Sequence, residues 1–226
     1  MKIIKELPNG KCIVEFQDDF KFQKEINNTN FMSGNVSNPY DKTLYGIGYL
    51  EVGKYNTFGD NKSRKTIPYI FWFNLMERCY SEKRRDEHMT YKDVYLCDEW
   101  CDFQKFAAWV DDNYYNVEGE RMHLDKDILI KGNKIYSPDT CLIVPQRINM
   151  MFMSKKKSRD SDLPNTIYRC AKGYKASYNG KSLGVFKTSE EAIQERDKAK
   201  RIHIRNIAEE YKDRISEKVY NALYKW

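Results

Sequence analysis

The side chains best suited to chemistry at a phosphate lie between His123 and Asn149. Asp125 and Asp127 are one residue apart in this segment, and Asn149 follows after a second apolar stretch. Carboxylate and amide oxygens are the ligands that Mg²⁺ prefers in proteins, and phosphate oxygens commonly complete its shell. The pattern therefore suggests a site for Mg²⁺, or for Mn²⁺ in its place, at a phosphodiester.

The same segment predicts the elements that would position these side chains. Leu124 to Ile130 alternates as a strand, Gly132-Asn133 turns the chain, and Leu142 to Val144 returns as a second strand. Pro145 then starts a helix that carries Arg147 and Asn149. In this arrangement Asp125 on the first strand and Asn149 on the helix would meet around one divalent ion.

The quoted letters from residue 124 to 149, "LDKDILIKGNKIYSPDTCLIVPQRIN", resemble the ββα-metal motif of phage-encoded HNH homing endonucleases. The resemblance implies that Asp125 and Asn149 are metal ligands. It aligns Thr140 with the orienting Asn of the family and Lys126 with its general-base His.

The lysine is a departure from the family pattern, because lysine is normally protonated at neutral pH and is then a poor proton acceptor. His123 precedes Asp125 by two residues and shares its face of the strand, so we expect His123 to replace the base. Asp127 shares this face as well and is a further candidate ligand. The alternative is that Asp125 and Asp127 are ordinary strand-end acids paired with Lys126 or Lys131.

The C-terminal part of the chain is basic. Residues 155–226 hold 18 basic and 10 acidic side chains, whereas the whole chain has a net charge of +6. Nucleic acid is the natural partner of such a surface, although a solvated face gives similar counts. The run that opens it is either a solvated linker or a tether along a DNA backbone, and comprises Lys155, Lys156, Lys157 and Arg159.

Residues 166–187 predict three short strands, with a strong hairpin signal at Asn179-Gly180. Thr188 and Glu191 form a capping box that opens a helix. The segment from Gly173 onward is similar to the DNA-binding domain of ethylene-response factors, but it departs from them at Gln194-Glu195-Arg196. Such a sheet can lie in the major groove of double-stranded DNA. The outward side chains expected to contact DNA are Arg169, Lys172, Lys175 and Lys181, accompanied by Tyr168, Tyr174 and Tyr178.

The middle of the chain contains two aromatic segments, residues 68–80 and 95–115, which predict a helix that is apolar all round and a second helix capped by Asp98. We interpret their aromatic residues as core, in preference to a platform for stacking bases. The stretch from residue 44 to 55 predicts a closely approached strand, or less specifically a fused form of the GIY-YIG nuclease signature.

The six cysteines are widely spaced without a Cys-x2-Cys pair, so we expect free thiols in a reducing cytoplasm. A zinc site is the less favoured reading, and its ligands would be Cys79, Cys97, Cys101 and Cys141.

These patterns predict an α+β protein with three parts. A small β element with a hairpin turn at Pro8-Asn9-Gly10 covers residues 1–43. An HNH-like ββα-metal domain with aromatic-rich helices covers 44–153, and a DNA-binding sheet with a helix covers 154–226. No apolar signal sequence and no run of about 18 apolar residues occurs, so we expect no membrane partner. The leading hypothesis is a phage-encoded HNH homing endonuclease that cuts double-stranded DNA in the bacterial cytoplasm. Its alternatives are a silent DNA-binding descendant of such a nuclease, acting as a regulator or as a counter-defence factor with a protein partner, and an RNA binder.

Overall fold

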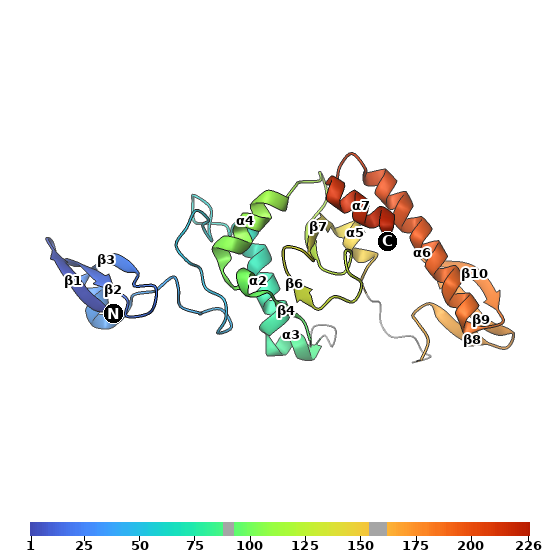
Figure 1. Cartoon of the computed structure of the whole chain (residues 1–226), viewed down its shortest axis with the longest axis horizontal. Helices are drawn as coiled ribbons and strands as arrows, with labels where there is room; N and C mark the ends of the chain where they lie inside the picture. Colours follow the sequence, from blue (N-terminus) through green and yellow to red (C-terminus); the bar gives the residue numbers. More distant parts are fainter. Residues whose placement is uncertain (88–92, 154–161) are drawn as a thin grey trace. The chain divides into compact units, whose positions relative to one another are not determined.

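The computed structural model has a mixed α+β fold, as the sequence predicts, and describes residues 1–87, 93–153 and 162–226 (Figure 1). The chain divides into two compact units. Unit 1 comprises Met1–Asp112 with Lys134–Ser137, and unit 2 comprises Asn113–Asn133 with Pro138–Trp226. Within the described ranges, no helix combines the length and apolar character needed to cross a membrane.

Unit 1 begins with a small antiparallel sheet. Its three strands are β1 (Lys2–Leu7), β2 (Lys11–Glu15) and β3 (Gln23–Asn27), in that order, followed by the short helix α1 (Asn28–Ser33). The predicted turn joins β1 to β2, and Asn9 and Gly10 adopt φ angles of 64° and 70°. Those left-handed angles suit a tight hairpin, which Asn and Gly tolerate best.

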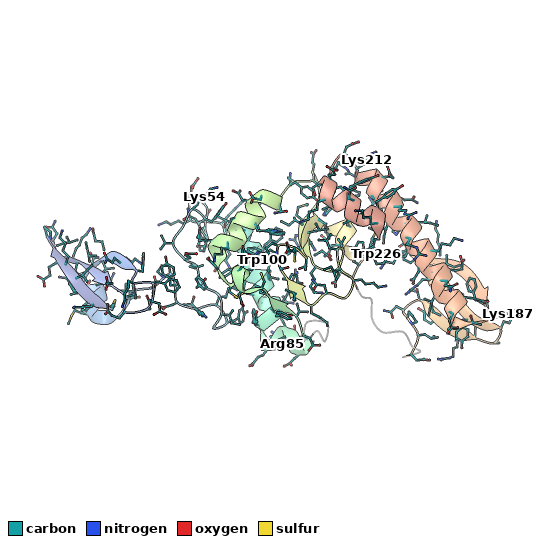
Figure 2. The ribbon with its side chains drawn as sticks, viewed as in Figure 1. Lys54, Arg85, Trp100, Lys187, Lys212 and Trp226 are labelled. Carbon is teal, nitrogen blue, oxygen red and sulfur yellow. The ribbon has the colours of Figure 1, made fainter. Side chains whose placement is uncertain are left out.

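The core of unit 1 is aromatic, as predicted. Helix α2 (Ile67–Tyr80) packs with the 3-10 turn η2 (Asp98–Cys101) and helix α4 (Phe103–Asn113), and the short helix α3 (Glu82–Glu87) follows α2. Trp72 and Trp100 are fully buried, and the Trp72 indole Nε1 donates a hydrogen bond of 2.8 Å to the Trp100 carbonyl. Figure 2 shows Trp100 among these helices. Helix α2 is not buried all round as predicted, because Ile70 on its other face is 43% exposed.

The segment 95–115, in which a helix capped by Asp98 was predicted, contains three elements. Tyr95–Leu96 forms strand β4, which pairs in parallel with β6 (Ile135–Tyr136). Asp98 does not cap α4. Instead, Asp102 interrupts the helical path with an extended backbone (φ −88°, ψ 118°), and its Oδ1 accepts a 2.8 Å hydrogen bond from the Gln104 amide. This contact opens α4 in the manner of an N-terminal cap.

Residues 44–55 form no regular strand, contrary to the prediction, but the close approach expected there is present. A Cβ atom added at Gly48 would lie 2.3 Å from the Met76 methyl and 2.9 Å from the Trp72 ring. Only the absence of a side chain lets this segment pass against α2.

Unit 2 contains a strand pair and a helix in the predicted order. Strands β5 (Met122–Asp125) and β7 (Leu142–Pro145) are antiparallel, and the helix α5 (Gln146–Met150) follows directly. The backbone turns between them at Gly132, with φ 74°, as the sequence predicts.

The C-terminal sheet of unit 2 has the strand order β10-β9-β8. Strands β8 (Ile167–Cys170), β9 (Gly173–Tyr178) and β10 (Lys181–Phe186) are antiparallel. Helix α6 (Ser189–Tyr211) begins with the predicted capping box and buries Ala192 against Ile167 and Ala176 of the sheet. The final helix, α7 (Glu217–Lys225), was not predicted, although Ser216 caps it by accepting from the Val219 amide.

Candidate active site

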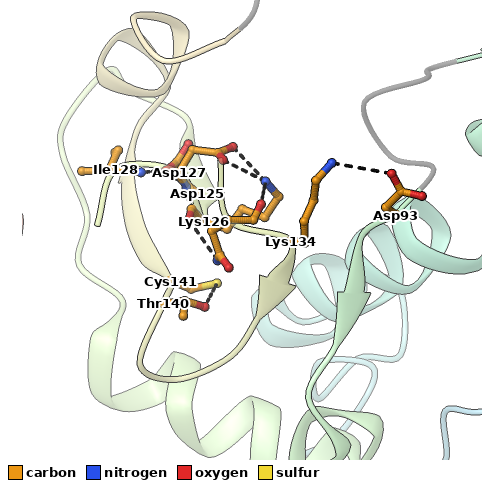
Figure 3. Close-up of polar contacts among 9 residues, drawn as sticks. Asp93, Asp125, Lys126, Asp127, Ile128, Lys134, Thr140 and Cys141 are labelled. Carbon is orange, nitrogen blue, oxygen red and sulfur yellow. Dashed lines mark hydrogen bonds and ion pairs between the residues drawn. The ribbon is translucent and has the colours of Figure 1, made fainter. Parts of the chain in front are cut away.

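Strand β5 ends at Asp125 and does not run to Ile130 as predicted. The Asp125 Oδ1 atom accepts hydrogen bonds of 2.8 Å from the backbone amides of Asp127 and Ile128 (Figure 3). This side-chain turn competes with the strand ladder and ends it. Asp125 is 7% exposed, and burial raises the pKa of its carboxyl above the ordinary value while the two amides lower it.

Lys126 occupies the position that the HNH resemblance assigns to the base, and its ammonium group is surrounded by acceptors. Nζ lies 2.9 and 3.0 Å from the two carboxylate oxygens of Asp127 and also donates to the Asn133 carbonyl. The Asn133 amide returns a 3.2 Å bond to the Lys126 carbonyl. An ammonium ion whose three donors all have acceptors is not a proton acceptor. The pairing of Asp127 with Lys126 is the alternative expected from the sequence, in which the acid is an ordinary partner of a neighbouring lysine.

The structure brings His123 and Asn149 together. His123 lies on β5, two residues before Asp125, and Asn149 lies on α5. The His123 Nδ1 and Asn149 Nδ2 atoms are 3.1 Å apart, and both side chains are partly buried. The sequence predicts a contact between the strand and the helix through Asp125 and Asn149, whereas in the structure His123 makes this contact with Asn149.

Thr140 lies in the turn before β7, and its hydroxyl is 3.9 Å from the Cys141 thiol (Figure 3). None of the six cysteines forms a disulfide; Cys97 directly precedes η2, and Cys101 ends it. Across residues 1–87, 93–153 and 162–226, no three His, Cys, Asp or Glu side chains gather into a metal-binding group. A metal at this site would therefore depend on amide and phosphate oxygens as well as carboxylates.

The seven side chains expected to point outward from the C-terminal sheet are divided between its two faces. Tyr174 packs into the core with α6, and the Tyr178 hydroxyl lies 3.0 Å from His203 Nδ1 on that helix. Arg169 is the cross-strand partner of Tyr174, and cross-strand partners share a face. Arg169 pairs with both carboxylate oxygens of Asp162.

The face opposite α6 keeps Lys175 and its cross-strand partner Tyr168, both exposed. Lys172 is exposed in the turn between β8 and β9. Lys181 is exposed but is the register partner of Tyr178. Lys155, Lys156, Lys157 and Arg159 lie outside the described residues.

Unit 2 also contains a cavity with a volume of about 1010 Å³, which was not predicted from the sequence. Its lining includes cationic side chains from segments far apart in the chain, among them Lys131, Arg147, Arg196 and Lys200. The four-residue spacing of Arg196 and Lys200 on one helix was a visible sign that these two share a face.

No protein-family model, curated protein or solved structure matches the chain.

Proposed function

We propose that the chain is a metal-dependent DNA endonuclease of the HNH type, with β5, β7 and α5 as its active site. The observation that carries this proposal is the 3.1 Å contact between His123 on the first strand and Asn149 on the helix, beside Asp125 at the strand end. A metal ligand at the strand end, a base on the same strand and an amide on the helix are the groups that such a site would use. DNA is the substrate class that the basic C-terminal sheet supports.

The residues present suit a hard cation. Asp125 Oδ1 already accepts two backbone amides, so Oδ2 is the oxygen to offer a metal. Asn149 Oδ1 has two lone pairs, so it can offer one to a metal as the second oxygen ligand even where it accepts a hydrogen bond from His123. Mg²⁺ is often held by one or two protein oxygens together with substrate phosphate, and when bound it would polarise the phosphodiester and stabilise the leaving oxygen.

The protonation of His123 decides whether it can act as the base. Where the Asn149 amide donates to Nδ1, the neutral ring carries its proton on Nε2 and offers a donor there. Where the amide is turned so that Oδ1 accepts from Nδ1–H, Nε2 keeps a lone pair and can take a proton from water. Catalysis therefore requires the second arrangement, in which the Asn149 oxygen orients the ring.

A catalytically silent DNA-binding protein is the second candidate, and one observation favours it. Lys126, at the position of the family base, is held by Asp127 and Asn133 in a saturated ion pair. A chain that had lost its general base but kept the fold would have a paired residue of this kind at the position of the base. Regulation of genes or obstruction of a host defence would then follow from DNA binding or from a protein partner.

The test is incubation of the full chain with supercoiled plasmid and phage DNA in Mg²⁺, then in Mn²⁺, followed by gel electrophoresis. We expect nicked or linear DNA. His123→Ala should lower the rate by roughly 10²–10⁴-fold, the usual contribution of a general base. Asn149→Ala should abolish most cleavage while DNA affinity stays nearly constant.

Matched controls come from the same unit. Asn206→Ala replaces an exposed asparagine on α6 and should leave cleavage unchanged, because it lies on another element. A wild-type protein that binds DNA but leaves it uncut in both metals would reject the nuclease and favour the silent binding protein. If Lys126→Met is as stable as the wild type but no longer cleaves DNA, we would infer that Lys126 contacts the phosphate directly.

A further inference from the structure

The large cavity of unit 2 is formed by parts of the chain that meet only in the folded protein. Its lining comes from the start of the unit, from α5 and the residues after it, from the C-terminal sheet and from α6. Trp226 also lines it. Figure 2 shows Trp226 at the end of α7. Its volume of about 1010 Å³ is at the upper end of the range for sites that enclose small organic ligands, about 300–1000 Å³.

The cavity carries an excess of positive charge. Its two acidic lining residues already have partners, since Glu120 accepts from the Tyr211 hydroxyl and Asp127 pairs with Lys126. Lys131 and Lys200 also line it, and neither forms an ion pair with another residue that the structure describes.

Lys200 lies beside two aromatic rings and two other cations. Its Nζ lies 4.4 Å from the centre of the Trp226 ring and 5.5 Å from that of Phe152, and the Lys131 Nζ lies 5.6 Å from the Trp226 ring. Burial, and then the charges of Arg196 and Lys131, lower the pKa of Lys200. A bound anion would relieve this repulsion between neighbouring cations.

Two polar atoms of the lining await a partner. Within the described part of the chain, Arg196 Nε and the Thr166 hydroxyl are buried without a hydrogen-bond partner. Thr166 also adopts a φ of 75°, a conformation that a β-branched residue seldom accepts. Buried donors without partners are uncommon in folded proteins.

We propose that this cavity binds a small phosphate ester of the nucleotide class. Lys131, Lys200 and Arg196 would hold the phosphate, and the aromatic wall of Phe152 and Trp226 would contact the base. Inorganic phosphate would leave most of the volume empty. The volume is that of a site for a small organic ligand and not for a duplex. The site is separate from the proposed nuclease function and stands without it.

Isothermal titration of the full chain with AMP, ATP and the dinucleotide pApA tests the proposal, with inorganic phosphate as the comparison. We expect at least one nucleotide to bind more tightly than phosphate. Lys200→Met should weaken that nucleotide by about tenfold or more, since a hydrogen bond to a charged group contributes about 1.5–3 kcal/mol. Lys198→Met removes the same charge from an exposed position on α6 outside the cavity and should change the affinity by less than about twofold.

Lys131→Met provides a second variant, because Lys131 lies on an exposed turn whose fold does not depend on its side chain. It should lower the affinity for the same nucleotide, and it tests the proposal even if Lys200→Met fails to fold. The proposal fails if no nucleotide binds at about 1 mM, or if Lys198→Met and Lys131→Met have equal effects. It also fails if no nucleotide binds and Lys131→Met lowers the affinity of the protein for a 20-base-pair duplex. The cavity would then be part of a DNA-binding surface.

Discussion

Asp125 has two tasks that use different oxygens of one carboxylate. Oδ1 closes the turn after β5 by accepting two backbone amides, and Oδ2 is the oxygen proposed for the metal. Substitutions that keep one oxygen and remove the charge separate these tasks, because the turn needs an acceptor and the cation needs an anion.

We therefore expect Asp125→Ala to be destabilised by about 1–3 kcal/mol, because two buried amides lose their acceptor. Asp125→Asn should keep most of the stability, since an amide oxygen can close the turn, but should lose most metal-dependent cleavage. Urea denaturation and the plasmid assay measure the two effects. Full cleavage by Asp125→Asn would contradict the role of Asp125 as a metal ligand, and Asp213→Asn on an exposed position is the charge-matched control.

Glu51 gives unit 1 a dependence on pH that the sequence does not reveal. The neighbouring carboxyl of Asp102 and burial raise the pKa of Glu51 to about 7. The folded state thus holds a proton that the unfolded chain releases near its ordinary value of 4.5. The resulting stabilisation is complete below pH 4.5 and is lost as pH rises through about 7.

Thermal denaturation between pH 5 and pH 8.5 should therefore show unit 1 losing stability as pH rises. Glu51→Gln, which keeps a hydrogen-bond donor toward Asp102 at every pH, should flatten this dependence. Glu6→Gln changes an exposed acid of the same unit and should keep the wild-type slope. An unchanged slope in Glu51→Gln would assign the dependence to other groups.

At the level of elements, the C-terminal sheet has one face suited to DNA. Lys175 and Tyr168 lie on the side away from α6, and Lys172 lies in the adjoining turn, whereas Arg169 is paired with Asp162. A sheet enters the major groove with its uncovered face. Lysines on that face would contact phosphate, and the remaining cations would contribute mainly through the field of the whole lobe.

Lys175→Ala and Lys172→Ala should each weaken duplex binding and reduce the slope of log K against log salt by about 0.9 per lost phosphate contact. Lys181→Ala, which shares a register position with the inward Tyr178, should change that slope much less. Fluorescence anisotropy at several salt concentrations measures all three. Equal slopes for the three variants would show that the sheet does not meet DNA with this face.

The elements that could be predicted depend on local signals. The turns at Asn9-Gly10 and Asn179-Gly180 and the cap at Thr188 act within four residues, so the sequence reveals them directly. The end of β5 could not be predicted by alternation, because Asp125 turns back on its own backbone. Nor could the break before α4, where Asp102 opens the helix and its backbone leaves the helical path.

At the level of the molecule, the candidate site was predicted only in part because its contacts cross long stretches of chain. The order of β5, β7 and α5 is local and was predicted, whereas the saturation of Lys126 and the cavity depend on folded neighbours. The predicted boundary at residue 154 follows a change in composition. Contacts within unit 2 nevertheless link the residues on its two sides.

Two contacts carry this link. Arg147 on α5 makes two hydrogen bonds to the carboxylate of Glu210, and the Tyr211 hydroxyl donates to Glu120. Tyr211 is 1% exposed, so its ring is part of the core at this end of α6. The last turns of α6 therefore depend on residues that precede the basic run, and the C-terminal sheet and helix are not stabilised by their own contacts alone.

Tyr211→Ala should accordingly destabilise unit 2 by about 3–5 kcal/mol, the range for removing a large buried ring. Tyr211→Phe keeps the ring and loses the bond to Glu120, so it should cost about 0.5–1.5 kcal/mol. Hydrogen exchange read by mass spectrometry resolves the two units, and exchange should accelerate in β5, β7 and α5 of Tyr211→Ala while α2 and α4 keep their protection. Tyr224→Ala, at a site that is 48% exposed, is the matched control and should leave both units protected. If exchange in Tyr211→Ala accelerates in α6 and α7 while β5 and β7 stay protected, the strand pair is stable without the C-terminal helices, and the proposed active site and the C-terminal sheet fold as separate parts.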